Sequence, residues 1–180
     1  MQTRATNLKE LGAILRASFP AESEEKGLAF QPHKTDVIIS PYTKSGTTWL
    51  QQIVHGLRTR GSMDFREISL VAPWIETAHD LGLDLEAKQV AEPRVYKSHS
   101  TYYDIPKGAR YIVSFRHYKD VLISTFRFFD NFFIEKGRIG LEEFLRWRWP
   151  EERRRGRQQE RQGRRGRDRS PASGHRQRRR

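Results

Sequence analysis

Residues 36–57 of this 180-residue chain read DVIISPYTKSGTTWLQQIVHGL and decide its fold. The β-branched run at residues 36–40 is typical of a short buried strand. A loop over residues 41–48 contains Lys44 and Gly46. Apolar residues then recur at helical spacing, namely Trp49, Leu50, Ile53, Val54 and Leu57. Strand, glycine-containing loop and helix follow each other in the order in which many phosphate sites are built.

The rest of the chain alternates in the same way. Two further strands are predicted at residues 94–97 and 110–115, and helices at residues 8–19, 68–83 (broken at Pro73), 120–133 and 141–147. Residues 20–36 are polar, contain two prolines and a glycine, and are predicted to be an irregular lead-in. Short strands between helices predict an α/β fold: a P-loop-like, three-layer parallel sheet flanked by helices, incomplete on its C-terminal side.

Charge divides the chain into two unequal parts. Lys and Arg number 34 against 22 Asp and Glu, a net charge of +12, and residues 151–180 carry +9 of it through 13 arginines and four acidic residues. That segment contains no Val, Ile, Leu, Met, Phe, Trp or Tyr, so it cannot bury enough apolar surface to offset its ordering entropy. We expect a partial α/β domain over residues 1–149 and a disordered, Arg-rich low-complexity tail over residues 150–180.

Composition excludes several classes of protein. The chain has no cysteine, which excludes a disulfide-stapled secreted module, a zinc ribbon, a thioredoxin-like site and a cysteine nucleophile. Its apolar runs are far too short to span a bilayer, and residues 1–19 mix charged with apolar side chains, unlike a secretory signal. We therefore expect a cytoplasmic protein without a membrane partner.

The loop around Lys44 is the sharpest local signal. Its backbone N–H groups, with the positive end of the helix dipole behind them, form an anion site, and Lys44 adds a mobile cation. It is not a Walker A loop, because that motif needs Gly-Lys-Ser/Thr in that order and here the lysine precedes Gly46. The alternative is an ordinary strand-to-helix turn with a solvated lysine.

Two further signals follow the other predicted strands. Lys97 and His99 lie two residues apart at the end of the second strand, where ligands of open α/β sheets bind, and histidine is a natural general base. Arg116 leaves the third strand and Ser124 lies in the next helix, so both could reach a phosphate. The alternatives are a hydrogen-bonded surface histidine and a structural ion pair of Arg116 or Lys119 with Asp120.

Together these segments resemble a known family. Residues 41–49 (PYTKSGTTW), 94–99 (RVYKSH), 105–113 (IPKGARYIV) and 116–124 (RHYKDVLIS) resemble, in order and spacing, the cytosolic sulfotransferases. The resemblance extends over about residues 20–149. Several motifs in one order are far more specific than any one of them.

The resemblance implies an enzyme that transfers a sulfuryl group from 3′-phosphoadenosine 5′-phosphosulfate (PAPS) to a small-molecule alcohol, phenol or amine, without a metal. It implies that the 5′-phosphosulfate is surrounded by Lys44, Ser45, Gly46, Thr47, Thr48 and Trp49. Lys44 then contacts the bridging oxygen, His99 takes the acceptor proton, and Lys97 contacts sulfuryl or acceptor oxygens. Arg116 and Ser124 are implied as ligands of the 3′-phosphate. The acceptor and the oligomeric state are left open.

The sequence departs from the family in two places. Thr43 stands where the family usually has proline before the loop lysine. The family also continues, past the point where the arginine tract begins here, through helices that build the acceptor pocket and a late Arg-Lys-Gly loop. We therefore expect weak stability and impaired turnover, and a frameshift or mispredicted exon junction near residue 149 as the origin of the tail.

Two other functions are weighed against this one. A non-catalytic sulfotransferase-like fragment could bind nucleic acid non-specifically through its Arg-rich tail, although no aromatic residue interleaves the tail for base stacking. A nucleoside-phosphate kinase is disfavoured by the missing Gly-Lys order and by the lack of an evident magnesium-binding carboxylate.

Overall fold

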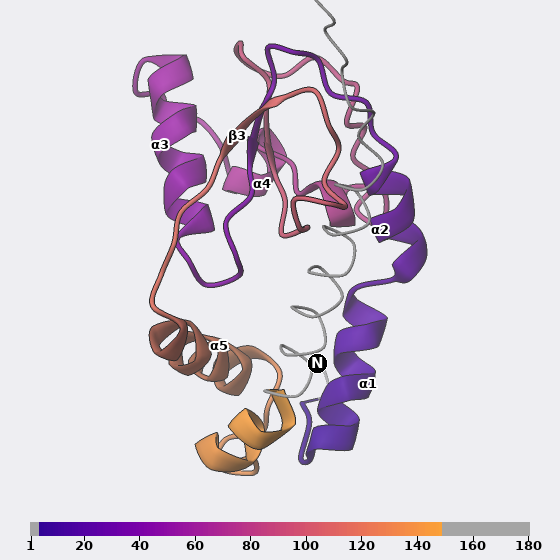
Figure 1. The fold of residues 1–180 in the computed structure, drawn as a ribbon, viewed down its shortest axis with the longest axis vertical. Coiled ribbons are helices and arrows are strands. Elements are labelled where there is room, and N and C mark those ends of the chain that lie inside the picture. Colours follow the sequence, from indigo (N-terminus) through magenta and orange to yellow (C-terminus); the bar gives the residue numbers. More distant parts are fainter. Residues whose placement is uncertain (1–3, 149–180) are drawn as a thin grey trace, which may run out of the picture.

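The computed structural model describes residues 4–148, and every structural statement below concerns this part of the chain. Its elements follow in the order α1 (Leu8–Ser18), α2 (Ala21–Leu28), β1 (Val37–Ile39), α3 (Thr47–Thr59), α4 (Ile68–Val71), the 3-10 helix η1 (Ile75–Thr77), β2 (Val95–Lys97), β3 (Arg110–Ile112) and α5 (Tyr118–Phe132) (Figure 1). A last helical stretch covers residues 141–148. The predicted tail lies outside the described residues.

The three strands form one parallel sheet in the order β2-β1-β3. Ile39 at the end of β1 lies opposite Lys97 in β2 and Ile112 in β3. All three strands therefore end at one edge, which brings together the segments that follow them.

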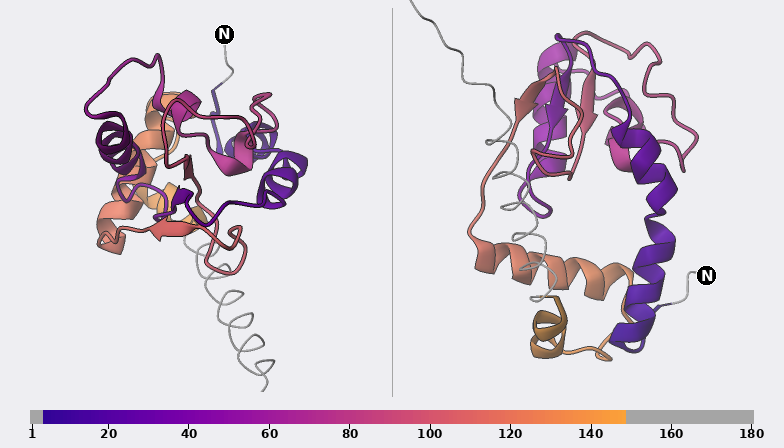
Figure 2. Two further views of the ribbon diagram at one scale, coloured as in Figure 1. Left: turned by 90° about the horizontal axis from the view of Figure 1, so that it is seen from above. Right: turned by 45° about the vertical axis from the view of Figure 1, so that its right-hand side comes forward.

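Helices cover both faces of this sheet, which confirms the predicted α/β fold (Figure 2). On one face, Ile38 and Tyr96 pack with Ile75 of η1, beside α2. On the other face, Val37, Ile39 and Val95 pack with residues of α3. Alternate side chains of a strand point to opposite faces, so the apolar run in β1 supplies both layers at once.

A separate apolar cluster joins α1, α5 and residues 141–148. Its buried members are Ala5, Leu11, Ile134, Ile139 and Phe144. The chain start is held there by two backbone hydrogen bonds, from Ala5 N–H to the Phe133 carbonyl (2.7 Å) and from Glu135 N–H to the Ala5 carbonyl (2.9 Å). In the views of Figures 1 and 2, α5 lies beyond the edge at which the strands end.

Three predicted boundaries are wrong. Of the helical stretch predicted over residues 68–83, only α4 and the single 3-10 turn η1 form, one on each side of Pro73. Residues 20–36 are not wholly irregular, because α2 forms there with Glu22 in its first turn and a Glu22–Lys26 ion pair of 2.7 Å. The third strand ends at Ile112 rather than residue 115, because β1 ends at Ile39 and turns into the loop; the Ser40 N–H to Ile112 carbonyl bond (2.9 Å) closes their pairing. None of the described helices is long and apolar enough to cross a membrane.

Candidate functional site

The loop between β1 and α3 has the backbone of an anion site. Ser45 N–H bonds the Tyr42 carbonyl (3.1 Å), and Lys44 (φ 61°) and Gly46 (φ 95°) both take left-handed conformations before α3 begins at Thr47. A left-handed lysine is uncommon, and such strain concentrates at functional sites. The first N–H groups of α3 have no partner within the helix. Thr47 Oγ1 is buried there and has no hydrogen-bond partner among the described residues.

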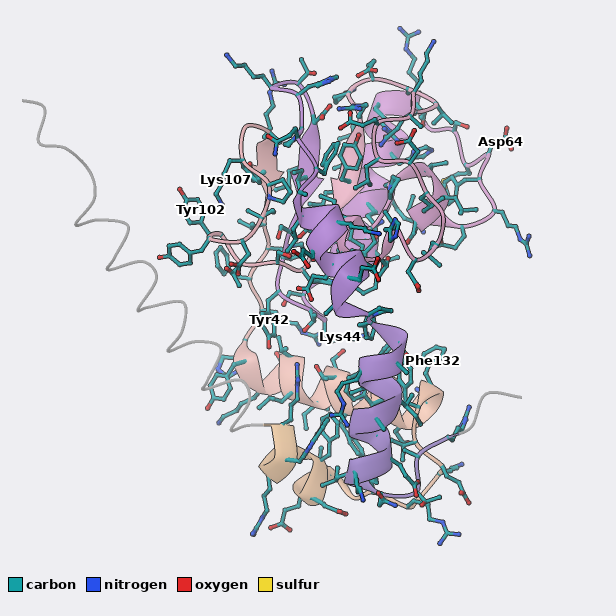
Figure 3. The ribbon with its side chains drawn as sticks, turned by 90° about the vertical axis from the view of Figure 1, so that its right-hand side faces the viewer. Tyr42, Lys44, Asp64, Tyr102, Lys107 and Phe132 are labelled. Atoms are coloured by element: carbon teal, nitrogen blue, oxygen red, sulfur yellow. The ribbon has the colours of Figure 1, made fainter. Side chains whose placement is uncertain are left out.

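Lys44 connects this loop to α5. Its ammonium nitrogen lies 4.2 Å from the ring centroid of Phe128, and its carbonyl accepts a hydrogen bond from Arg116 Nη1 (3.0 Å). The pKa of Lys44 is lowered, first by desolvation and then by the charge of Arg116. Lys44 is thus half-buried between the sheet and α5, as Figure 3 shows, and is not a freely solvated lysine.

The ring of His99 has a defined tautomer. His99 Nδ1 lies 3.1 Å from the carbonyl oxygen of Pro41. A carbonyl can only accept, so Nδ1 carries the hydrogen and Nε2 presents its lone pair. Desolvation, followed by the charges of Lys97 and Lys44, lowers the pKa of His99 to about 4. The imidazole is therefore neutral near pH 7 and has the form that a general base needs.

Lys97 shares an aromatic neighbour with His99. Its ammonium lies 4.0 Å from the ring centroid of Trp74, and the Trp74 and His99 rings meet edge to face at 5.3 Å. Desolvation lowers the pKa of Lys97 as well. The three predicted catalytic residues thus come together from the ends of β1 and β2.

The two predicted phosphate ligands lie beside the same loop. Arg116 is exposed and bound to the Lys44 carbonyl, while Ser124 is half-buried one helical turn before Phe128, the ring under Lys44. Among the described residues, the Arg116 guanidinium bonds the Lys44 carbonyl and no hydrogen bond links it to Ser124. Within residues 4–148, neither Arg116 nor Lys119 pairs with Asp120, so the alternative of a structural ion pair is absent there.

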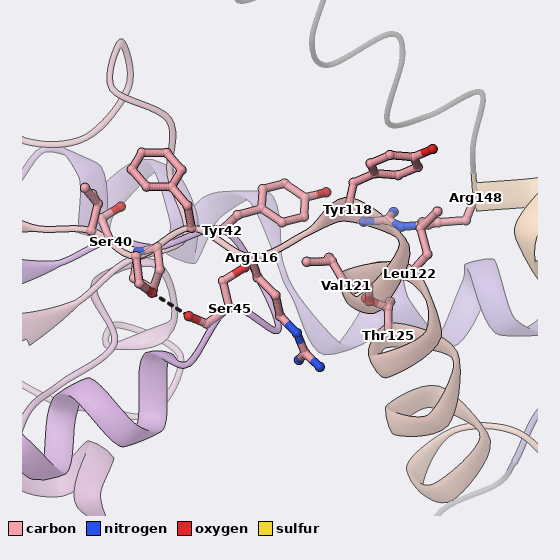
Figure 4. Close-up of a pocket in the computed structure, with 13 residues that line it drawn as sticks. Ser40, Tyr42, Ser45, Arg116, Tyr118, Val121, Leu122, Thr125 and Arg148 are labelled. Atoms are coloured by element: carbon pink, nitrogen blue, oxygen red, sulfur yellow. Dashed lines mark hydrogen bonds between the residues drawn. The ribbon is translucent and has the colours of Figure 1, made fainter.

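A cavity of about 340 Å³ lies between the loop and α5 (Figure 4). Its lining includes Tyr42, Ser45, Arg116, Tyr118 and Thr125. Thr48 and Trp49 of the predicted loop are exposed. Among residues 4–148, no group of three or more His, Asp or Glu side chains is placed to hold a metal ion.

One residue beside the site is not predicted from the sequence. Glu76 of η1 accepts hydrogen bonds from Ser98, His99 and Ser100 through a single oxygen. Nothing in its local pattern distinguishes it from a surface glutamate, because the contact joins residues 22 to 24 positions apart. Its role becomes visible only once η1 lies beside β2.

Comparisons with known proteins indicate one family. A family model described as "Sulfotransferase domain" matches residues 34–157. The chain is similar to 3-beta-hydroxysteroid sulfotransferase of Cavia porcellus (32% identity) and to Sulfotransferase 2A1 of Rattus norvegicus (33%), each over 120 residues that make up 62% of this chain and 41% of the relative. It thus spans about two fifths of the length of these relatives.

A solved structure gives the same result for the fold. The crystal structure of a putative steroid sulphotransferase from Arabidopsis thaliana superposes with a TM-score of 0.52 at 16% identity, covering 81% of this chain and 64% of that one. This likeness concerns the fold alone, whereas the family model matches well over half of the sequence. The chain belongs to the sulfotransferase family.

Proposed function

We propose that this chain binds PAPS and transfers its sulfuryl group to the hydroxyl of a small apolar alcohol, with residues 1–149 as the sulfotransferase-like unit. The observation that carries the proposal is the His99–Pro41 hydrogen bond, which leaves the imidazole with a free Nε2 lone pair beside two lysines. An unprotonated base next to cations suits transfer of an anionic group to an alcohol.

The donor is assigned to the loop and its neighbours. The N–H groups at the start of α3, the buried hydroxyl of Thr47 and the ammonium of Lys44 fit the oxygens of a phosphosulfate. Arg116 and Ser124, beside Lys44 and Phe128, are assigned to the 3′-phosphate. Ser45, Gly46, Thr48 and Trp49 complete the loop.

The proposed chemical step uses only side chains of this protein and its two substrates. Nε2 of His99 takes the proton of the acceptor hydroxyl while the acceptor oxygen forms its bond to sulfur. The bond between sulfur and the bridging oxygen breaks, and that oxygen leaves with 3′-phosphoadenosine 5′-phosphate. Lys44 stabilises the charge that develops on the leaving oxygen, and Lys97 the oxygens of the sulfuryl group.

An apolar surface beside His99 favours an apolar acceptor. Trp74 contacts the His99 ring, and Phe19 lies 5.6 Å from Trp74 between ring centroids. Flat hydrocarbon stacks well on such rings. Because relatives are named for 3-beta-hydroxysteroids and 3-alpha-hydroxysteroids, we assign a hydroxysteroid as the acceptor of this chain.

The test is transfer of ³⁵S-labelled sulfate from PAPS to a hydroxysteroid by the purified chain. His99→Ala is expected to reduce the rate at least about 100-fold, since general base catalysis contributes about 10²–10⁴-fold. His33→Ala, a change at an exposed histidine, is expected to retain the wild-type rate. Equal rates for wild type and His99→Ala contradict the assignment of the base, and no transfer by wild type contradicts the proposed activity.

A further inference from the structure

Glu76 is held beside the carboxyl end of β2. Lys97 N–H donates to the Pro73 carbonyl (2.8 Å), and Trp74 forms an isolated parallel bridge with Lys97. The segment that leads into η1 therefore runs along the strand that ends in Lys97. Glu76 follows on this segment and reaches the turn after the strand.

One carboxylate oxygen of Glu76 accepts three hydrogen bonds. Oε1 accepts hydrogen bonds from Ser98 Oγ (3.0 Å), the backbone N–H of His99 (2.5 Å) and Ser100 Oγ (3.0 Å). Oε2 is buried and has no hydrogen-bond partner among the described residues. Hydrogen bonds to a charged acceptor are about twice as strong as neutral ones. Three consecutive residues are thereby fixed to a single point.

This fixation determines where the His99 ring points. The turn is also held from its other side, because Ser40 Oγ donates to the Ser100 carbonyl (3.1 Å). With the backbone of His99 fixed between Glu76 and Ser40, Nδ1 reaches the Pro41 carbonyl. Loss of the carboxylate frees the turn and, with it, the ring.

The same carboxylate acts on Lys97 through its charge. Desolvation lowers the pKa of Lys97, and Glu76 is the strongest influence that raises it; Glu67 acts in the same direction and Lys44 in the opposite one. An ionised Glu76 therefore favours the cationic form of Lys97, while burial raises the pKa of Glu76 itself.

We propose that Glu76 is a positioning residue of the sulfotransfer site: its Oε1 fixes the direction and tautomer of the His99 ring. The inference rests on the proposed function, in which His99 and Lys97 act on the acceptor and the sulfuryl group. It assigns a role to a buried carboxylate that touches neither substrate.

Two substitutions separate the two effects. Glu76→Gln retains an acceptor oxygen for the three donors and removes the charge, whereas Glu76→Ala removes both. Glu25→Gln, at an exposed position of α2, is the matched control for loss of a negative charge. Circular dichroism establishes that each variant is folded.

Nuclear magnetic resonance measures both effects without turnover. Long-range ¹H–¹⁵N correlation reports the His99 tautomer, and a ¹³C-lysine titration reports the pKa of Lys97, with His99→Gln and Lys97→Arg for assignment. We expect Glu76→Gln to keep the Nδ1–H tautomer and to lower the pKa of Lys97. Glu76→Ala is expected to give averaged ring ¹⁵N shifts in addition, and Glu25→Gln to match wild type.

The outcomes are decisive in either direction. A wild-type tautomer in folded Glu76→Ala overturns the positioning of the ring, and an unchanged Lys97 titration in Glu76→Gln overturns the effect of charge. If Glu76→Ala does not fold, the His99 tautomer in Glu76→Gln decides, and loss of the Nδ1–H form there overturns positioning by an acceptor oxygen at this place. In the sulfate assay, Glu76→Ala is expected to reduce kcat about 100-fold with little change in KM for PAPS. A wild type without turnover contradicts the proposed function and leaves the magnetic resonance results standing.

Discussion

At the scale of single residues, the site is a place where positive charge is disfavoured. Burial lowers the pKa of Lys44, Lys97 and His99, and a neighbouring cation adds to the effect in each case: Arg116 acts on Lys44, Lys44 on Lys97, and both lysines on His99. An anion among these groups relieves both penalties, because an opposite charge favours the cationic form. The electrostatics of these residues thus suit a polyanionic ligand better than a neutral one.

The depressed pKa of His99 predicts a pH dependence of stability. As the pH falls from 6.5, the ordinary pKa of histidine, towards about 4, the unfolded chain takes up the proton first. The free energy of unfolding therefore decreases over this interval, and His99 accounts for up to about 3 kcal/mol of the decrease. Urea unfolding of wild type and His99→Gln at pH 7, 6, 5 and 4 measures the difference.

The comparison isolates His99 because Glu76, whose pKa burial raises, is present in both proteins. His33→Gln, at an exposed histidine, is expected to follow the wild-type curve. A pH dependence of His99→Gln that matches wild type between pH 6.5 and 4 contradicts a buried, neutral imidazole.

At the scale of elements, α2 shows how packing overrides composition. Its sequence AESEEKGL is polar and predicts no helix, yet the helix forms and packs against η1. The contact requires Gly27, because a Cβ there would clash with the carbonyl oxygen of Ile75. Gly27 weakens α2 as an isolated helix. The same residue allows α2 to approach η1, the element that carries Glu76.

Two glycine substitutions test this contact. Gly27→Ala is expected to lower the free energy of unfolding by about 1–3 kcal/mol, the usual range for overpacking. Gly56→Ala, in α3 with nothing within 4 Å of the added Cβ, is expected to raise it by about 1 kcal/mol through helix propensity. Urea unfolding curves check both values. Stabilisation by both substitutions contradicts the close approach of α2.

The elements also show what the sequence could predict. Runs of apolar residues with strong periodicity predict β1, α3, α5 and the parallel sheet. The spacing of the motifs predicts that Lys44, Lys97 and His99 lie at one edge of this sheet. Periodicity does not predict α2, whose stability comes from its tertiary contact with η1. Periodicity does not predict Glu76 either, because hydrogen bonds between residues 22 or more positions apart leave no local pattern in the sequence.

At the scale of the whole molecule, the described residues form three apolar clusters. One lies on each face of the sheet, and α1, α5 and residues 141–148 form the third. Lys44 lies between the sheet and α5 in Figure 3, in contact with the ring of Phe128. The weak stability expected from the sequence stays a prediction.

We expect the chain to self-associate through the β3 edge of the sheet. The segment after β3, the outer strand of the sheet, exposes Phe115 (95%) and Val113 (53%), and exposed apolar side chains favour contact with another chain. Phe115→Asp is expected to lower the self-association of the chain in sedimentation velocity, with little effect on unfolding. Leu81→Asp, at an apolar residue exposed elsewhere (62%), is expected to sediment like wild type. Equal effects of the two substitutions contradict an origin at this edge.

The resting position of Lys44 makes α5 a determinant of how tightly the loop would bind an anion. An ammonium on an aromatic face is stabilised by about 0.5–2 kcal/mol, so a ligand that draws Lys44 away from Phe128 has to overcome that amount. In terms of a dissociation constant, this is a weakening of roughly 2- to 30-fold. Phe128 of α5 thus influences how readily Lys44, on a loop from another part of the sequence, turns towards a bound anion.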